Sequence, residues 1–157
     1  MNKRLNSIVD LNKYPIHDLE SPTIKKLIER CKDDLDKYSC STVPNFILPK
    51  SLKIMSQELE KQLDEVYMSK ESINPYLYAK DDPSLNKDHP KRTFMNRYNG
   101  YLNSDCFPKD SEMKFLYETD ELLNFISKCL GVYPIYRWAD PLACHAYNVM
   151  KPEGILP

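Results

Sequence analysis

The chain has 157 residues, of which 41% are hydrophobic and 29% are charged, and its formal net charge at pH 7 is −1. This length and composition fit one globular domain, and the near-neutral charge excludes the basic surface of a general nucleic-acid or anionic-membrane binder. No apolar run approaches a membrane span, so no membrane partner is expected. The five cysteines contain no Cys-x-x-Cys pair. We therefore expect a cytoplasmic protein with reduced thiols, without a disulfide framework or zinc site.

The N-terminal part predicts an irregular segment followed by a helix. Residues 1–20 show no periodic pattern and are interpreted as an irregular lead-in with at most one short strand. Ser21 and Pro22 are typical of a helix start, because Ser caps the first turn and Pro is tolerated at the first helical position. Apolar residues then recur at helical spacing and predict an amphipathic helix that ends near Tyr38.

A second helix is predicted after an extended segment. Prolines at both flanks of residues 42–49 indicate a short edge strand or a linker. The helix is expected to begin near Ser51, with a buried side that runs from Leu52 to Tyr67. Together the two helices are expected to form a helical support over about 21–70. Neither helix is apolar all round, so each should pack on another element, most simply a sheet.

The middle of the chain is rich in turn-forming residues. Residues 74–90 predict a long loop, and 91–100 predict a strand that ends at an Asn-Gly pair. Residues 106–111 are interpreted as a further loop. A third helix is expected over about 119–130, because acidic residues suit its positive end and Gly131 suits its stop.

Residues 133–157 predict antiparallel strands. Two apolar runs are separated by an Asp-Pro corner at 140–141, and the second run, 142–150, lacks Gly and Pro and is typical of a strand. Residues 151–154, Lys-Pro-Glu-Gly, predict a type I turn. The last three residues, 155–157, are interpreted as the start of a returning strand that continues beyond the chain.

The order of these elements predicts an α+β fold over a single domain, 1–157. Helices come first and strands follow without strand–helix alternation. We expect the helices to brace one face of a mainly antiparallel sheet. Most of that sheet is expected to lie beyond the chain, so the domain is interpreted as the N-terminal part of a larger one.

Two segments near the C-terminus resemble a known family. They read Tyr136-Arg137-Trp138-Ala139-Asp140-Pro141-Leu142 and Tyr147-Asn148-Val149-Met150-Lys151-Pro152. This pattern resembles the iron(II)- and 2-oxoglutarate-dependent oxygenases of the amino-acid hydroxylase and halogenase type, over about 91–157. In that family, such a segment leads into a strand and a Pro/Gly turn, and the returning strand carries a His-x-Asp metal motif. The resemblance implies the first strands of a double-stranded β-helix, or jelly roll.

The resemblance also implies where the metal ligands belong. The three histidines, His17, His89 and His145, open no His-x-Asp or His-x-Glu pair. The first ligand is therefore expected just past Pro157. Two histidines and one carboxylate would hold Fe(II) and leave positions open for 2-oxoglutarate and oxygen. We expect the intact parent to use Fe(II) and 2-oxoglutarate to hydroxylate or halogenate a small molecule such as a free amino acid. We expect this chain alone to contain no metal-ligating or catalytic residue and to be inactive.

Five residues are candidates for binding. Tyr147 and Asn148 point to opposite faces of their strand, and the resemblance implies that one of them contacts 2-oxoglutarate; the alternative is ordinary sheet packing. Arg97, Arg137 and Asp140 are candidates for substrate binding, since Arg suits a bidentate carboxylate clamp. The alternative for Arg137 and Asp140 is a salt bridge between them that fixes the Asp-Pro corner. For Arg97 the alternative is a solvated or structural role.

Two neighbouring residues are given structural interpretations. His145 lies on the predicted strand 142–150 and is expected to be a partly buried, hydrogen-bonded histidine. Cys144 is interpreted as a small buried apolar residue, because the sequence places no obvious base beside it.

A different class of function is also compatible with the sequence. The chain is alternatively a non-catalytic α+β interaction module, complete as it stands, whose terminal strand pairs with a protein partner by strand addition. A fragment should expose an apolar sheet face and an unpaired edge near 142–157, whereas a complete module should have a closed core. The sequence indicates no oligomeric state.

Overall fold

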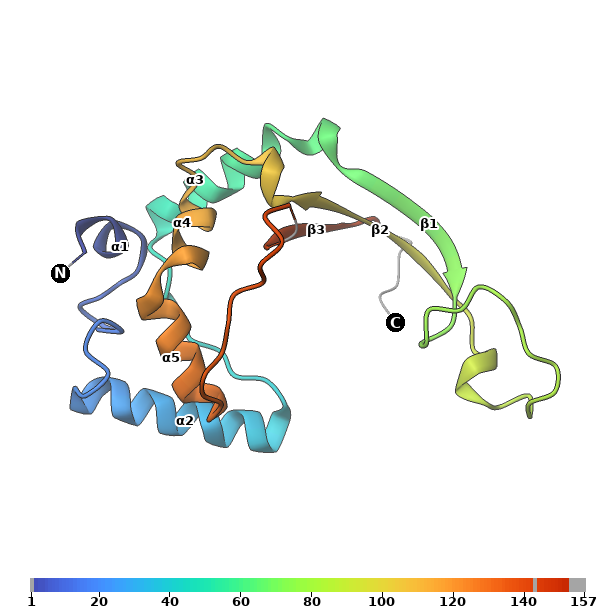
Figure 1. The fold of residues 1–157 in the computed structure, drawn as a ribbon, viewed down its shortest axis with the longest axis horizontal. Helices are drawn as coiled ribbons and strands as arrows, with labels where there is room; N and C mark the ends of the chain where they lie inside the picture. The colour runs from blue at the N-terminus through green and yellow to red at the C-terminus, as the bar shows by residue number, and fades with distance from the viewer. Residues whose placement is uncertain (1, 143, 153–157) are drawn as a thin grey trace.

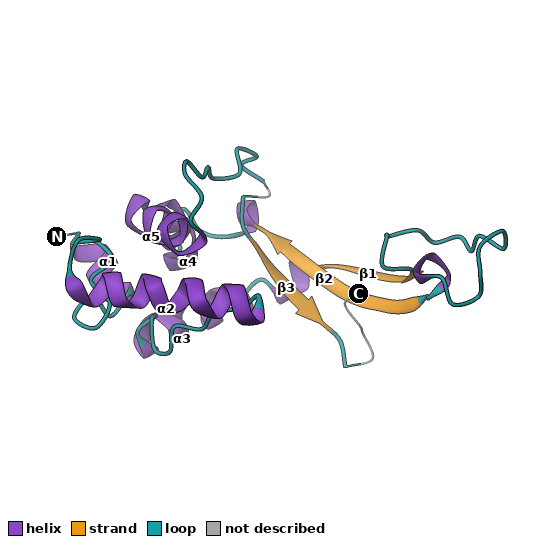
Figure 2. Cartoon of the chain, turned by 90° about the horizontal axis from the view of Figure 1, so that it is seen from below, coloured by secondary structure: helices purple, strands orange, loops and turns teal. Residues whose placement is uncertain are grey.

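A computed structural model describes residues 2–142 and 144–152, which form a helical layer and a three-stranded antiparallel sheet (Figures 1 and 2). The predicted α+β class is confirmed. The helices and strands, in chain order, are α1 (Lys3–Ile8), α2 (Pro22–Tyr38), α3 (Pro49–Glu60), β1 (Tyr67–Ile73), β2 (Met95–Asn103), α4 (Glu112–Glu118), α5 (Asp120–Leu130) and β3 (Ala146–Met150). Short 3-10 helices span Leu63–Glu65, Pro90–Arg92 and Ser104–Cys106.

Helix α2 begins where the sequence predicts. The Ser21 hydroxyl accepts a hydrogen bond from the Ile24 amide at 3.4 Å, and Pro22 occupies the first helical position. The helix ends at Tyr38, and Ser39 follows in the left-handed conformation. The prediction for this helix is confirmed because capping and periodicity agree.

Residues 1–20 are more ordered than expected. Helix α1 is capped by Asn2, whose side-chain oxygen accepts hydrogen bonds from the amides of Arg4 and Leu5. Leu5 and Ile8 are fully buried. The interpretation as an irregular lead-in is wrong, because a helix of six residues is too short to show a repeating apolar pattern.

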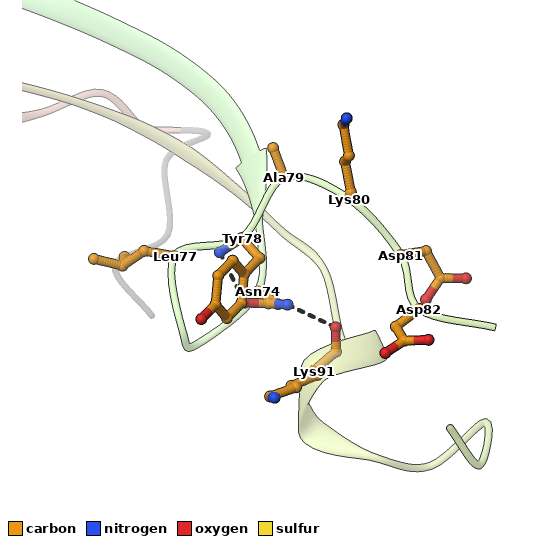
Figure 3. Close-up of a pocket in the computed structure, with 8 residues that line it drawn as sticks. All are labelled: Asn74, Leu77, Tyr78, Ala79, Lys80, Asp81, Asp82 and Lys91. Carbon is orange, nitrogen blue, oxygen red and sulfur yellow. Dashed lines mark hydrogen bonds between the residues drawn. The ribbon is translucent and has the colours of Figure 1, made fainter. Parts of the chain in front are cut away.

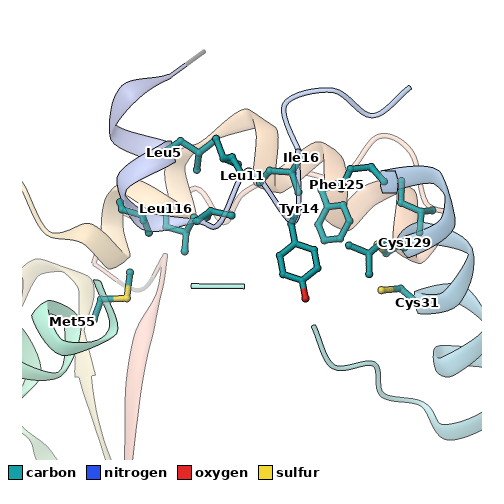
Figure 4. Packing of buried hydrophobic residues seen from close by; sticks show 14 residues of the cluster. Leu5, Leu11, Tyr14, Ile16, Cys31, Met55, Leu116, Phe125 and Cys129 are labelled. Carbon is teal, nitrogen blue, oxygen red and sulfur yellow. The ribbon is translucent and has the colours of Figure 1, made fainter. Parts of the chain in front are cut away.

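One hydrophobic cluster holds the helical layer together (Figure 4). The rings of Phe46 and Phe125 stack with centroids 6.1 Å apart, and the Tyr14 hydroxyl donates to the Pro44 carbonyl at 2.6 Å. The predicted edge strand at 42–49 is reduced to a single bridge between Val9 and Ile47. The buried members of the cluster are Leu5, Ile8, Val9, Leu11, Tyr14, Ile16, Ile24, Leu27, Ile28, Cys31, Met55, Leu116, Phe125 and Cys129.

The second predicted helix is shorter than expected. Helix α3 runs from Pro49 to Glu60, and β1 then begins at Tyr67. The helical support therefore does not reach residue 70, and Leu63 and Tyr67 are 48% and 63% exposed rather than buried. Tyr67 fits the helical spacing, but its pairing with Tyr101 of β2 makes it part of a strand.

Strand β2 is the middle strand of the sheet, in the order β1-β2-β3. The predicted strand at 91–100 begins later, at Met95, and continues to Asn103, past the expected stop at Asn99-Gly100. The strand continues through Asn99 and Gly100 because both pair with residues of β1. The segment after β2 contains helix α4, which the sequence analysis did not predict.

Helix α5 confirms the predicted helix at 119–130. Gly131 follows it with φ 66°, the left-handed conformation expected of a helix stop. Phe125 and Cys129 are buried, whereas Ile126 and Leu130 are partly exposed. The helix is thus buried on one side only.

The C-terminal strands differ from the prediction. Residues 133–142 are irregular, and Trp138 is 68% exposed, so the predicted first strand is wrong. The second is confirmed only as β3, Ala146–Met150. The expected turn at 151–154 and the expected strand at 155–157 lie mostly or wholly outside the described residues. An apolar run without a pairing partner does not form a strand, which explains the difference at 133–142.

The helices pack mainly on one another, and the sheet projects from one side of the helical layer (Figure 1). We expected the helices to brace one face of the sheet, and this arrangement is a correction. At the junction, the Ser104 hydroxyl donates to the Pro141 carbonyl at 2.7 Å, and the Ser104 amide donates to the Leu142 carbonyl at 3.1 Å. No helix in the described part of the chain is long and apolar enough to cross a membrane.

We predict that Gly100→Ala destabilises the protein by about 1–3 kcal/mol, the usual cost of overpacking. A Cβ at this position would lie 2.6 Å from the Tyr67 carbonyl oxygen and 2.7 Å from Val66 Cγ1, and backbone cannot move aside cheaply. Urea unfolding measures the change. As a control, Ser72→Ala at an exposed position of β1 should stay within about 0.5 kcal/mol of the parent. Equal stability of Gly100→Ala and the parent would contradict the packing described here.

Candidate functional site

One face of the sheet carries the polar residues best placed to bind a ligand. Side chains directly across from one another in an antiparallel sheet share a face, so the register determines its members. We name it the open face. It comprises Tyr67, Ser69, Glu71 and Ile73 of β1, Met95, Arg97, Asn99, Tyr101 and Asn103 of β2, and Ala146, Asn148 and Met150 of β3.

Arg97 is the main cationic group of the open face. Its Nε donates to Asn99 Oδ1 at 2.8 Å, and Asn99 is buried, so the guanidinium is held over β2. Within the described residues its Nη groups have no hydrogen-bond partner. Glu71 lies directly across from Arg97 on β1. The guanidinium is thus positioned by one neutral amide and keeps donors for an anionic group.

Asn148 lies on the same face as Arg97. It is exposed and pairs with Tyr101, whereas Met150 pairs with Asn99. Asn148 is therefore diagonal to Asn99, a relation that separates Cβ atoms by about 7–8 Å. Arg97 lies four residues from Tyr101 along β2, which is roughly 14 Å along the strand. Arg97 and Asn148 therefore share the open face, with Asn99 and Tyr101 along the β2 side between them.

Tyr147 lies on the reverse face. It pairs with buried Leu102, and its ring centroid is 4.8 Å from that of Phe107. Burial raises the pKa of Tyr147, and the nearby Glu58 carboxylate adds to the effect. Its hydroxyl is buried and has no hydrogen-bond partner among the described residues. Of the two candidates for the 2-oxoglutarate contact, only Asn148 shares a face with Arg97.

His145 packs between aromatic rings at the start of β3. Its centroid lies 6.1 Å from that of Phe107 and 5.6 Å from that of Tyr117, and the ring is partly buried as expected. The expected hydrogen bonding is only partly found, because Nε2 is buried and has no partner among the described residues. Its Nδ1 is 3.4 Å from Cys144 Sγ, and Cys144 is half-buried. Burial lowers the pKa of His145, with a further lowering by Lys114. This environment favours the neutral ring.

Helices α3 and α4 meet beside this aromatic group. The Ser111 hydroxyl donates to Glu58 Oε2 at 2.7 Å, and the Glu112 amide donates to Glu58 Oε1 at 3.3 Å. Ser111 also caps α4, since its hydroxyl accepts from the Lys114 amide. The sequence analysis missed Asn99, Glu58 and Ser111. Only Ser111, followed by the acidic Glu112, carried a local signal, that of a helix cap.

Arg137 and Asp140 lie in the connection from α5 to β3 rather than on the open face. Arg137 Nη2 pairs with Asp120 at 2.8 Å, and its Nε donates to the Tyr117 carbonyl at 3.1 Å. Asp140 accepts from the Leu142 amide at 2.9 Å. The expected pair between Arg137 and Asp140 is therefore wrong: each instead holds its own segment of backbone in place.

The predicted loop at 74–90 encloses a hollow of about 540 Å³ (Figure 3). Asn74 is 1% exposed and holds the loop: its amide group donates to the Lys91 carbonyl at 2.6 Å and accepts from the amides of Tyr76 and Tyr78. Arg92 pairs with Asp81 at 2.7 Å. Because these groups are used to shape the loop, the hollow is a weaker candidate than the open face.

Within residues 2–142 and 144–152, no group of three or more His, Cys, Asp or Glu side chains is arranged to hold a metal ion. Comparisons of the chain with protein-family models, with curated proteins and with solved structures find no match.

We predict that His145 makes the protein less stable as the pH is lowered. Its folded pKa is below the ordinary value of 6.5, so the unfolded chain binds more protons as the pH falls through about 6.5. The stabilisation from neutral His145 is complete above that pH and is lost below it. Urea midpoints between about pH 7.5 and pH 5 measure the loss, which should be smaller in His145→Phe. If the urea midpoint falls equally in the parent and in His145→Phe, the loss of stability does not come from His145.

Proposed function

We propose that the open face forms one wall of the ligand pocket of an iron(II)- and 2-oxoglutarate-dependent oxygenase. The observation that carries the proposal is that Arg97 and Asn148 share one face of an antiparallel sheet, while Tyr147 packs on the other. This is the arrangement expected if the three strands belong to a double-stranded β-helix whose interior holds the ligand. The reaction would be hydroxylation or halogenation of a small molecule such as a free amino acid, a class that follows from the family resemblance.

The chemistry of the two side chains supports this assignment. A guanidinium binds a carboxylate through two parallel hydrogen bonds, and both 2-oxoglutarate and an amino acid carry carboxylates. The Asn148 amide offers a donor and an acceptor to a polar group on the same ligand. Arg97 is held by Asn99 before any ligand arrives, which reduces the conformational entropy lost on binding.

In this proposal the described residues bind and orient, and the iron ligands come from other residues. The described part of the chain offers no ligand set that fits iron, so no step is assigned to a metal on it. Bound iron and 2-oxoglutarate would supply the oxidising chemistry. The contribution of this chain is the anchoring of a carboxylate at Arg97.

We predict that Arg97→Gln raises the KM for 2-oxoglutarate or for substrate at least about 10-fold in the protein encoded by the intact reading frame. Losing a charged hydrogen bond costs about 1.5–3 kcal/mol. Asn148→Ala should have a smaller effect in the same direction. The KM of each variant is measured from the rate of succinate formation in the presence of Fe(II). Lys70→Gln, on the reverse face of the same sheet, is the matched control and should match the parent. An unchanged KM in Arg97→Gln, or no iron-dependent succinate formation by the parent, would refute the proposal.

We further predict that the 157-residue chain alone binds no stoichiometric Mn(II), used as a redox-stable substitute for Fe(II). Isothermal titration calorimetry with and without 2-oxoglutarate measures binding. A tight one-to-one site in this chain would mean that its own residues ligate the metal, and the division of roles proposed above would then be wrong.

A second candidate function rests on the edge of β3. The described residues of β3 are hydrogen-bonded to β2 on one side only, and the strand Ala146–Met150 contains no charged residue. Charged side chains normally protect sheet edges from further pairing, as Lys70 and Glu71 do on β1. Addition of a strand from a protein partner at this edge is therefore the alternative, and loss of β3 amide exchange on partner binding would favour it.

A further inference from the structure

Two cysteines that are 98 positions apart in the sequence meet inside the helical layer. Cys31 lies on α2 and Cys129 on α5, and these helices pack directly against each other. The two side chains are 3% and 8% exposed, and both belong to the hydrophobic cluster shown in Figure 4. The other three cysteines lie outside this cluster.

Both thiols also line one small hollow of about 200 Å³ between α2, α5 and the segment that follows α2. Its other walls are mostly apolar, including Leu35, Val43 and Phe125. Two thiols that share one apolar hollow are accessible to a small uncharged oxidant, whereas a large charged disulfide such as oxidised glutathione is poorly suited to it.

The position of Cys31 also affects the ionisation of Cys129. Burial raises the pKa of Cys129 to about 12, and the neighbouring Cys31 thiol adds to the effect. The Cys129 thiol is therefore protonated at rest and reacts slowly, because the thiolate is the reactive form. Slow reaction with a small oxidant is compatible with a pair that stays reduced under ordinary conditions.

We propose that hydrogen peroxide slowly oxidises Cys31 and Cys129 to a disulfide between α2 and α5. One thiolate attacks hydrogen peroxide, which becomes hydroxide as the sulfur is oxidised to a sulfenic acid. The other thiol then displaces water from this sulfenic acid and forms the S–S bond. In total, two thiols and one peroxide yield one disulfide and two waters. A thiol reductant reverses the step.

The consequence follows from the position of the pair. A disulfide at these positions would close a loop that contains α3 and the whole β1–β2 hairpin, because all of these elements lie between the two cysteines in the sequence. Cross-links that close long loops restrict the unfolded chain most. The oxidised protein is therefore expected to unfold at a higher temperature than the reduced protein.

The test uses the full 157-residue chain with Cys40, Cys106 and Cys144 replaced by Ser, so that only the pair remains. After treatment with hydrogen peroxide, the protein should lose about 2 Da and both titratable thiols, and should unfold at a higher temperature. Dithiothreitol should restore the original mass. The same background with Cys31→Ala is the matched control, and it should gain oxygen instead of losing mass.

A second measurement does not depend on any variant. Non-reducing peptide mapping of the peroxide-treated parent chain should find the peptides of Cys31 and Cys129 linked. Gain of oxygen without loss of mass in the two-cysteine protein would overturn the proposal. Linkage of either cysteine only to Cys40, Cys106 or Cys144 in the parent would also overturn it.

Discussion

Every side chain of the sheet takes its direction from the pairing of β2, which is hydrogen-bonded to β1 on one side and to β3 on the other. Side chains alternate between the two faces along a strand. A slip of one residue in either ladder would therefore move the open-face side chains of the slipped strand to the reverse face. The β2–β3 ladder places Asn148 on the face of Arg97, and the β1–β2 ladder places Glu71 across from Arg97. The composition of the open face is therefore a property of the register rather than of one residue.

The sheet depends on the helical layer at one end only. The ring centroid of Tyr117 on α4 lies 5.6 Å from that of His145, which directly precedes β3, and Ser104 connects the end of β2 to the backbone that leads from α5 to β3. Beyond these contacts, the hairpin of β1 and β2 extends away from the helices (Figure 1). The core that supplies most of the hydrophobic stabilisation is thus separate from the surface that carries the polar candidates. This division would let the open face change in sequence with little effect on the core.

Local signals in the sequence were sufficient for some elements. Ser21 and Pro22 mark the start of α2, and Gly131 marks the end of α5, because capping and left-handed backbone depend on the residue itself. The α+β class also followed from the order of elements. These features could be predicted because no distant part of the chain is needed to explain them.

Other features depend on pairing that a single sequence does not reveal. Tyr67 fits a helical pattern but joins β1, because a partner strand is available in β2. Residues 133–139 are apolar but have no such partner and remain irregular. The alternation of Tyr147 and Asn148 was predictable, but which of them shares a face with Arg97 required the register. The predicted strand at 91–100 already contained both Arg97 and Asn99, but the hydrogen bond between their side chains is seen only in the structure.

The loop between β1 and β2 shows how little sequence is needed to shape a surface. The side chain of Asn74 satisfies backbone groups on both sides of the loop, at Tyr76, Tyr78 and Lys91. The three residues after Pro75 are exposed and contribute little to the buried packing. Position 74 therefore constrains the backbone path, while the side chains at the tip are free to vary. Such a loop can acquire a new recognition sequence without any change in the strands that carry it.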